Sequence, residues 1–148
     1  MKKMLIALLA TLSFFAAMIS SAQAHCEIPC GIYDDQARFD EITEHIATVE
    51  KAMQQITKLQ EEKKTDYNQL VRWINNKDTH AGYIQEIASQ YFLTQRIKFD
   101  ADNYDKKLEA LHRIIVYAMT CKQTIDTENV TKLRTALQDF KDLYMGKK

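Results

Sequence analysis

The residues with the clearest capacity for chemistry lie together in one short segment that precedes the first helical pattern. His25 is followed directly by Cys26, and Cys30 comes four positions later. If the chain begins at His25, five donors fall within six residues. They are the α-amine and imidazole of the histidine, the backbone amide nitrogen of Cys26 and the two thiolates. A short loop can bring these donors to one metal ion.

The donor types discriminate among metals. Amine, amide and thiolate donors in one plane suit a d⁸ ion such as nickel(II), because square-planar or tetragonal nitrogen and sulfur sets are typical of nickel or copper. Zinc prefers four tetrahedral donors, and the sequence offers no second Cys/His pair to complete them. His45, His80 and His112 are isolated in the sequence. We expect the first two at helix surfaces or edges and His112 beside the core, and none of them as a ligand.

The residues around the two cysteines favour a closed loop. The bond preceding Pro29 can adopt the cis form at modest cost, which would fold Cys30 back toward Cys26. Gly31 suits a sharp exit from the loop because it has no Cβ. Taken alone, the cysteine pair fits a small disulfide loop equally well, since oxidation is the default in an exported chain. The histidine N-terminus, Pro29 and Tyr33 together favour the metal site.

The first 24 residues have the pattern of a cleaved signal peptide. Lys2 and Lys3 form a positive start, residues 4–19 are almost wholly apolar, and residues 22–24 read Ala-Gln-Ala, which fits the small-x-small cleavage rule. The apolar run is shorter than the roughly 20 residues of a membrane span. We therefore expect residues 1–24 to be removed and the mature protein to be periplasmic or extracellular, with no membrane attachment.

The charge of the mature chain argues against nucleic acid as a partner. Removal of Lys2 and Lys3 leaves 18 basic and 20 acidic side chains, a net charge of −2 with histidine neutral. A protein that binds phosphate backbones usually has a basic excess or a basic stripe. Here Lys and Arg alternate with Asp and Glu, which predicts a solvated helix surface.

Composition and periodicity predict an all-α fold. The chain has only three Gly and one Pro, so residues that break helices or form hairpin turns are scarce. Four segments carry apolar residues at helical spacing, and the short connections between them predict an antiparallel up-down four-helix bundle over residues 34–148. The four stripes are Phe39, Ile42, Ile46, Val49, Met53, Ile56 and Leu59; then Leu70, Ile74, Ala81, Ile84, Ala88, Tyr91 and Gln95; then Tyr104, Leu108, Leu111, Ile115, Ala118 and Lys122; and finally Val130, Leu133, Leu137, Phe140 and Tyr144.

Helix ends and irregularities can also be predicted. Short side chains that accept hydrogen bonds are preferred as N-terminal caps of helices. We expect Asp34 or Asp35 to cap the first helix, the second helix to begin near Asp66, and Asp126 or Thr127 to cap the last. The polar residues 75–78 suggest a local bend in the second helix. Cys121 lies near an apolar stripe and is expected to be a buried, reduced thiol.

Residues 25–33 read His-Cys-Glu-Ile-Pro-Cys-Gly-Ile-Tyr, and this segment resembles the nickel-hook signature of nickel superoxide dismutases. The similarity extends through residues 33–39 and, more loosely, to residues 90–96. The resemblance implies a homohexamer of antiparallel four-helix bundles with one nickel ion in each subunit. It also implies that His25, Cys26 and Cys30 are the nickel ligands and that Pro29 is cis.

The resemblance further implies roles for residues outside the hook. Tyr33 would lie over the open axial face of the metal, and Tyr91 would help to order water and substrate there. Glu41 stands where the family places a carboxylate that orients the histidine imidazole, although a gap of one residue would put Asp40 in that place. Arg72 is the candidate for the family's basic residue near the site.

The implied reaction is the disproportionation of superoxide to oxygen and hydrogen peroxide by nickel that cycles between the (II) and (III) states. Two thiolates and a deprotonated amide would stabilise the higher state. Two alternatives remain open at this point: a periplasmic carrier that holds nickel or copper in the same hook without turnover, and a haem-binding bundle. The haem alternative has only His112 and scattered methionines as axial candidates, and it lacks the Cys-x-x-Cys-His attachment signature.

Overall fold

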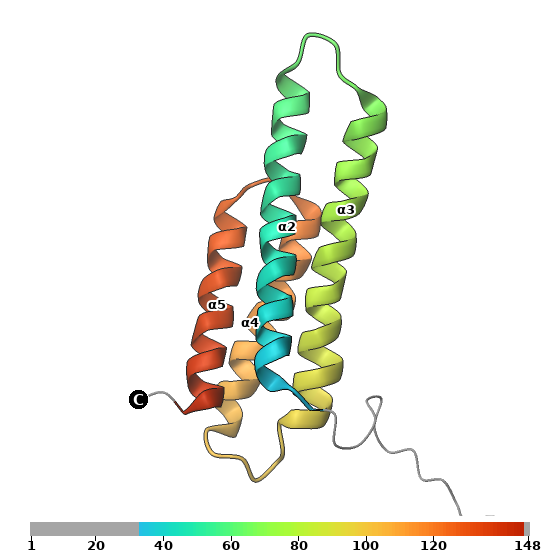
Figure 1. Cartoon of the computed structure of the whole chain (residues 1–148). Coiled ribbons are helices and arrows are strands. Elements are labelled where there is room, and N and C mark those ends of the chain that lie inside the picture. Colours follow the sequence, from blue (N-terminus) through green and yellow to red (C-terminus); the bar gives the residue numbers. More distant parts are fainter. Residues whose placement is uncertain (1–32, 147–148) are drawn as a thin grey trace, which may run out of the picture. The chain divides into compact units, whose positions relative to one another are not determined.

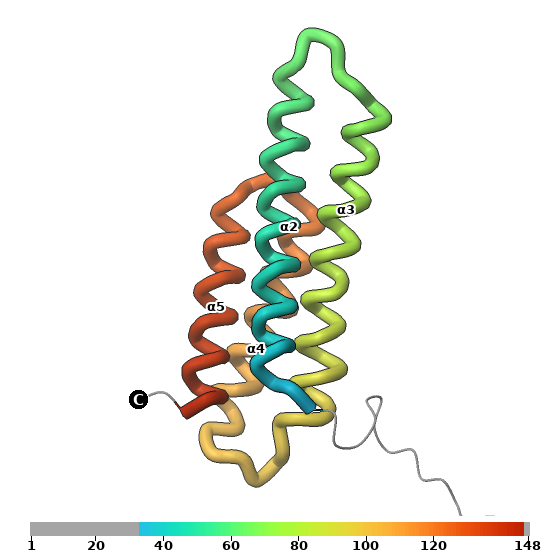
Figure 2. Tube along the Cα trace, viewed as in Figure 1, coloured from blue at the N-terminus to red at the C-terminus, as the bar shows by residue number. Residues whose placement is uncertain are grey.

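The computed structural model describes residues 33–146, and within this range the regular elements are all helical. They are α2 (Asp35–Glu61), α3 (Tyr67–Glu86), the π-helix η1 (Ile87–Arg96), α4 (Tyr104–Gln123) and α5 (Glu128–Met145). η1 continues directly from α3. Successive helices are antiparallel neighbours, and α5 packs against α2 (Figures 1 and 2). The predicted all-α four-helix bundle is confirmed. Residues 25–30, with the predicted cis bond at Pro29, lie outside the described residues.

Acidic side chains fix the starts of three helices. The Asp34 carboxylate accepts from the backbone N–H of Ala37 at 3.0 Å, and Asp66 caps α3 by accepting from two backbone N–H groups at 3.1 Å each. At α5 the side chain of Thr127 makes no capping bond, whereas Asp126 accepts from the N–H of Glu128 at 2.9 Å. Because Asp34 caps α2, the neighbouring Asp35 is available for other contacts.

The core confirms the predicted stripe of α2 and that of α5 apart from the half-buried Tyr144, but it shifts the stripe of α4. Every predicted stripe residue of α2 is buried, as expected for apolar positions that step by three and four. In α4 the buried side chains include Ile114 and Cys121, while the predicted Ile115 is only half-buried. Residues 114–116 are all apolar, so periodicity alone could not determine which of them faces the core.

The first half of α3 differs from its predicted role. Of the predicted core residues here, Ile74 is 38% exposed and Leu70 is only half-buried. Tyr67 and Val71, which lie outside the predicted stripe, are 74% and 54% exposed. The reason is visible in Figure 1, where the end of α2 and the start of α3 extend as a hairpin beyond the connection between α4 and α5. These side chains therefore have no third or fourth helix to pack against.

The bend predicted at residues 75–78 is wrong, because α3 runs unbroken through them. Lys77, in this polar segment, is only 3% exposed. Its ammonium group donates to the carbonyl oxygens of Cys121 at 2.8 Å and Lys122 at 2.5 Å. Carbonyl groups in the last turn of a helix lack partners within the helix and carry partial negative charge. The polar segment thus joins α3 to the C-terminal end of α4.

Cys121 is fully buried, and burial raises the pKa of its thiol to about 11. We predict that Cys121→Ser lowers the free energy of unfolding by about 1–2 kcal/mol, because a hydroxyl buried without a hydrogen-bond partner is unfavourable. Urea unfolding followed by circular dichroism measures this change. Cys121→Ala, which adds no polar atom, should remain closer to the wild type. Loss of bound nickel from the folded serine variant would contradict a purely structural role.

Candidate active site

A single carboxylate, that of Asp35 in the first turn of α2, gathers three side chains from other elements. The hydroxyl groups of Tyr91 and Tyr144 donate to it at 2.6 and 2.8 Å. Arg96 donates through Nε at 2.8 Å and through Nη2 at 2.7 Å, the bidentate arrangement that makes arginine–carboxylate pairs strong. We call these four residues the Asp35 cluster. The cluster links α2, η1 and α5.

The π-helical geometry of η1 explains how two of its residues reach the same carboxylate. Tyr91 and Arg96 are five positions apart, and hydrogen bonds in a π-helix join residues i and i+5. Residues at this spacing therefore lie on the same face of a π-helix. In an α-helix the same two side chains would point about 140° apart. A side-chain bond follows the same period, since the Thr94 hydroxyl donates to the carbonyl oxygen of Ser89 at 2.8 Å.

Tyr33 and Tyr91, the two tyrosines expected at the site, lie side by side. Their ring centroids are 6.0 Å apart. The guanidinium carbon of Arg96 lies 4.7 Å from the centroid of the Tyr33 ring, and that of Arg38 lies 5.4 Å from the Tyr91 ring, within the range of cation–π attraction. The Tyr33 hydroxyl donates to Oε1 of Gln95 at 3.3 Å. Tyr33 is half-buried and Tyr91 is buried, so the two side chains differ in their overall exposure to water.

The cluster sets the protonation states of its members. Partial burial alone would raise the pKa of Asp35, but hydrogen bonds from Arg96, Tyr91 and Tyr144 outweigh it and hold that pKa below the ordinary 3.8. Burial and the bond to Asp35 raise the pKa of Tyr91 well above its usual value and that of Tyr144 to about 12. The carboxylate is therefore charged and both phenols are neutral across the physiological range.

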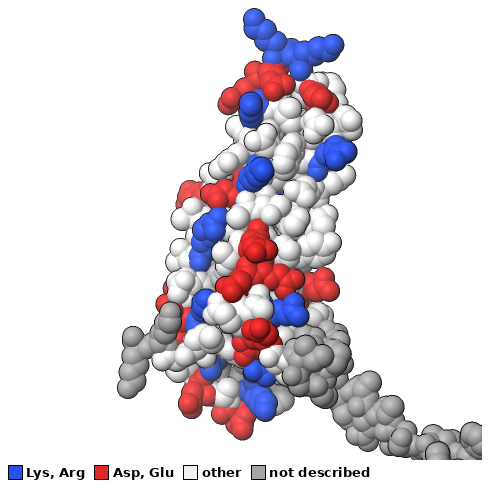
Figure 3. Space-filling model, viewed as in Figure 1, with Lys and Arg blue, Asp and Glu red and all other residues white. Residues whose placement is uncertain are grey.

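The remaining predicted residues are placed around this cluster or apart from it. Glu41 forms an ion pair with Arg38 at 2.5 Å, and Asp40 is exposed and accepts from the Gln36 amide at 2.7 Å. Arg72 is exposed on α3. Arg96, which the sequence reasoning did not single out, is the basic residue that contacts both Asp35 and Tyr33. Charges of both signs are interspersed on the face drawn in Figure 3.

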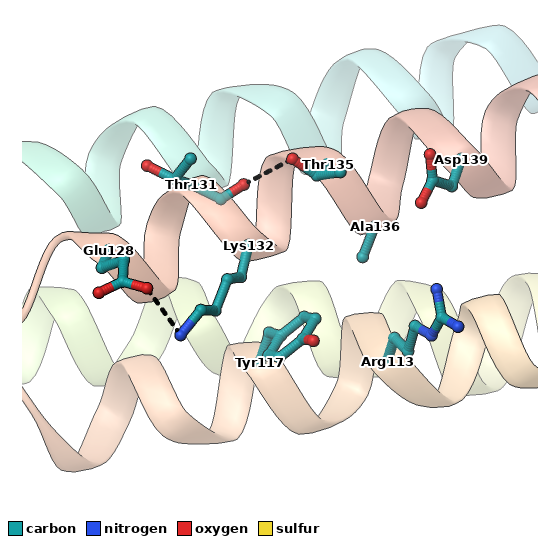
Figure 4. Close-up of a pocket in the computed structure, with 8 residues that line it drawn as sticks. All are labelled: Arg113, Tyr117, Glu128, Thr131, Lys132, Thr135, Ala136 and Asp139. Atoms are coloured by element: carbon teal, nitrogen blue, oxygen red, sulfur yellow. Dashed lines mark hydrogen bonds and ion pairs between the residues drawn. The ribbon is translucent and has the colours of Figure 1, made fainter.

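No group of three or more His, Cys, Asp or Glu side chains within residues 33–146 is arranged to hold a metal ion. The proposed ligands His25, Cys26 and Cys30 lie outside this range. A groove of about 240 Å³ between α4 and α5 contains an ion pair between Lys132 and Glu128 at 3.0 Å (Figure 4). Neither Tyr33 nor Tyr91 lines this groove, so it belongs to a different part of the bundle.

Asp35→Asn removes the charge that Arg96 and the two tyrosines share. We predict a loss of about 1.5–3 kcal/mol in the free energy of unfolding near neutral pH, the range for hydrogen bonds to charged groups. Because folding lowers the pKa of Asp35, its contribution is fully present above 3.8 and is lost as the pH falls through the lowered value. The variant should therefore lose less stability than the wild type between about pH 5 and pH 2.

Urea unfolding across this pH range tests the prediction, with Asp139→Asn, at an exposed position of α5, as the matched control. An Asp35→Asn variant as stable as the control at neutral pH would contradict a structural role for the cluster.

A family model described as nickel-containing superoxide dismutase matches residues 20–148. The match includes the candidate ligands His25, Cys26 and Cys30 as well as the whole helical bundle. Searches of curated proteins and of solved structures returned no match. The family model covers most of the chain, including the candidate metal-binding segment and the helices that follow. The chain therefore belongs to the nickel-containing superoxide dismutase family, and it is a nickel-dependent oxidoreductase that acts on superoxide.

Proposed function

We propose that the mature protein begins at His25 and dismutates superoxide with one nickel ion per subunit, held by His25, Cys26 and Cys30. The observation that carries the proposal is the family match across residues 20–148, since it includes this donor set. When bound, nickel supplies an electron acceptor and an electron donor in turn, by cycling between the (II) and (III) states. One superoxide loses an electron to become oxygen, and a second gains that electron and two protons to become hydrogen peroxide.

The chemistry of the donor set fits nickel. Two thiolates and a deprotonated backbone amide are anionic, and negative charge on the ligands favours the higher oxidation state. Nitrogen and sulfur donors of this kind are typical of square-planar or tetragonal nickel and copper. The α-amine of His25 exists only after cleavage following Ala24, so removal of the signal peptide would also complete the ligand set. The imidazole of His25 would complete the donor set, with Glu41 as the candidate residue to orient it.

The two tyrosines are proposed to hold water and substrate and to help deliver protons, but in different ways. The hydroxyl hydrogen of Tyr91 is donated to Asp35 at 2.6 Å, and its raised pKa keeps the phenol neutral. Its oxygen can still accept a hydrogen bond from water. Tyr33 is more exposed, so its hydroxyl is the better candidate to exchange protons with solvent. General acid–base groups act through such hydrogen-bonded contacts.

Assembly and location are further parts of the proposal. Tyr67, Val71 and Ile74 form an exposed apolar stripe on α3, which supports contact with other subunits, and we propose the homohexamer typical of the family. No helix in the range 33–146 is both long and apolar enough to cross a membrane. We propose export to the periplasm or the extracellular space after cleavage of residues 1–24.

The ligand assignment predicts that Cys26→Ser and Cys30→Ser each reduce superoxide dismutation to the background rate. Each variant should retain wild-type helicity, because the described bundle does not include these residues. Stopped-flow or pulse-radiolysis assays after nickel loading measure the rate, and circular dichroism measures helicity. Cys121→Ser is the matched control and should stay active. Wild-type turnover in either the Cys26 or the Cys30 variant would contradict the assignment of both thiolates as ligands. Nickel binding without turnover in the wild type would instead favour a metal carrier.

A further inference from the structure

We propose that His45 and His80 form a second metal site, separate from the hook, which binds a divalent transition-metal cation between α2 and α3. Both residues were expected to be isolated, but the bundle brings them into contact. Imidazole ligands suit copper, nickel and zinc, and affinity for such sites is highest for copper(II). The ligand class is therefore a divalent cation that favours nitrogen donors, with copper(II) bound most tightly.

The distance between the two imidazoles matches two adjacent positions on one ion. Their Nδ1 atoms are 2.9 Å apart. Two metal–nitrogen bonds of about 2.0–2.1 Å at a right angle place the nitrogen atoms about 2.9 Å apart, whereas a tetrahedral angle would separate them by about 3.3 Å. Right angles between neighbouring ligands are typical of tetragonal copper(II) and nickel(II). The pair therefore has the spacing of a tetragonal site.

The backbone of both helices holds this spacing. His45 is adjacent to Ile46 on α2, and His80 is adjacent to Ala81 on α3; both neighbours have 0% exposure. Each histidine is thus anchored by a residue that is fixed in the core. Ligands on rigid elements are positioned more accurately than ligands on loops. The two imidazoles are presented to each other by the packing of α2 against α3.

The surroundings keep the His45 imidazole neutral, which is the form that binds a metal ion. Burial and the neighbouring His80 lower its pKa, and they outweigh the carboxylates of Glu41 and Glu44, which act in the opposite sense. The centroid of the Tyr83 ring lies 5.2 Å from that of the His45 ring and 5.7 Å from that of the His80 ring. Both histidines are half-buried, so water can reach the remaining coordination positions.

A metal bound by both histidines would join α2 to α3 in the folded state only. A ligand that binds only the folded state raises its stability by an amount that grows with the logarithm of the free ligand concentration, once that concentration exceeds Kd. Copper(II) should therefore raise the unfolding temperature of the nickel-loaded enzyme. Substitution of either histidine should remove this increase without changing activity, because neither residue belongs to the hook or to the Asp35 cluster.

The test uses the nickel-loaded enzyme, so that the hook is already filled, and adds copper(II). Electron paramagnetic resonance reports nitrogen ligands on the added copper, equilibrium dialysis gives its affinity, and elemental analysis shows that nickel is retained. We expect one added copper ion per subunit with two imidazole ligands. His45→Gln and His80→Gln should each weaken binding about tenfold or more, whereas His112→Gln, at an exposed position of α4, should not.

The result that would overturn the proposal is a nickel-loaded wild type that binds no added copper, in which case the two rings share only an N–H···N hydrogen bond. Equal copper affinity in the wild type and in both single variants would overturn it as well. Circular dichroism of each variant verifies its fold, and the spectrum of the wild type reports the ligands even if one variant is unstable. The outcome does not depend on dismutase activity, so failure here and failure of the proposed reaction are distinguishable.

Discussion

The charged hydrogen bonds to Asp35 are the constraint on which the arrangement of the tyrosines depends. One partly buried carboxylate accepts from Tyr91, Tyr144 and both donors of Arg96, and these residues come from two other elements. Beneath the cluster the ring of Phe39 lies 4.8 Å from that of Phe92, so apolar packing supports the same junction. Loss of the carboxylate would leave a cation and two phenols without their shared acceptor, which is costly in a partly buried site.

This constraint has consequences for how the residues can serve the reaction. Tyr91 is locked by Asp35 and neutral, so it suits positioning, whereas the more exposed Tyr33 suits exchange with water. Arg96 and Arg38 lie over the two tyrosine rings, but each is also paired with a carboxylate. Their charge is largely compensated, and their main effect is to hold the aromatic pair rather than to attract an anion over distance.

The sequence predicts the structure well where one hydrophobic period governs a segment, and poorly where that period changes. The α2 stripe follows from apolar steps of three and four, but the contact of Arg96 with Asp35 depends on the π-helix, which α-helical periodicity cannot reveal. Asp35 itself was considered only as an alternative cap. His45 and His80 were expected to be isolated because their contact depends on how α2 packs on α3. The hook has a specific sequence signature, yet its conformation lies outside the described residues.

We propose that the chain becomes a superoxide dismutase when His25 is its N-terminus and carries nickel. The most direct measurement is pulse radiolysis of superoxide with two nickel-loaded chains, one beginning at His25 and one retaining Ala24. We expect that only the chain beginning at His25 accelerates superoxide decay catalytically, since only that chain offers the α-amine of His25 as a ligand. Equal acceleration by both chains, or none by either, would contradict it.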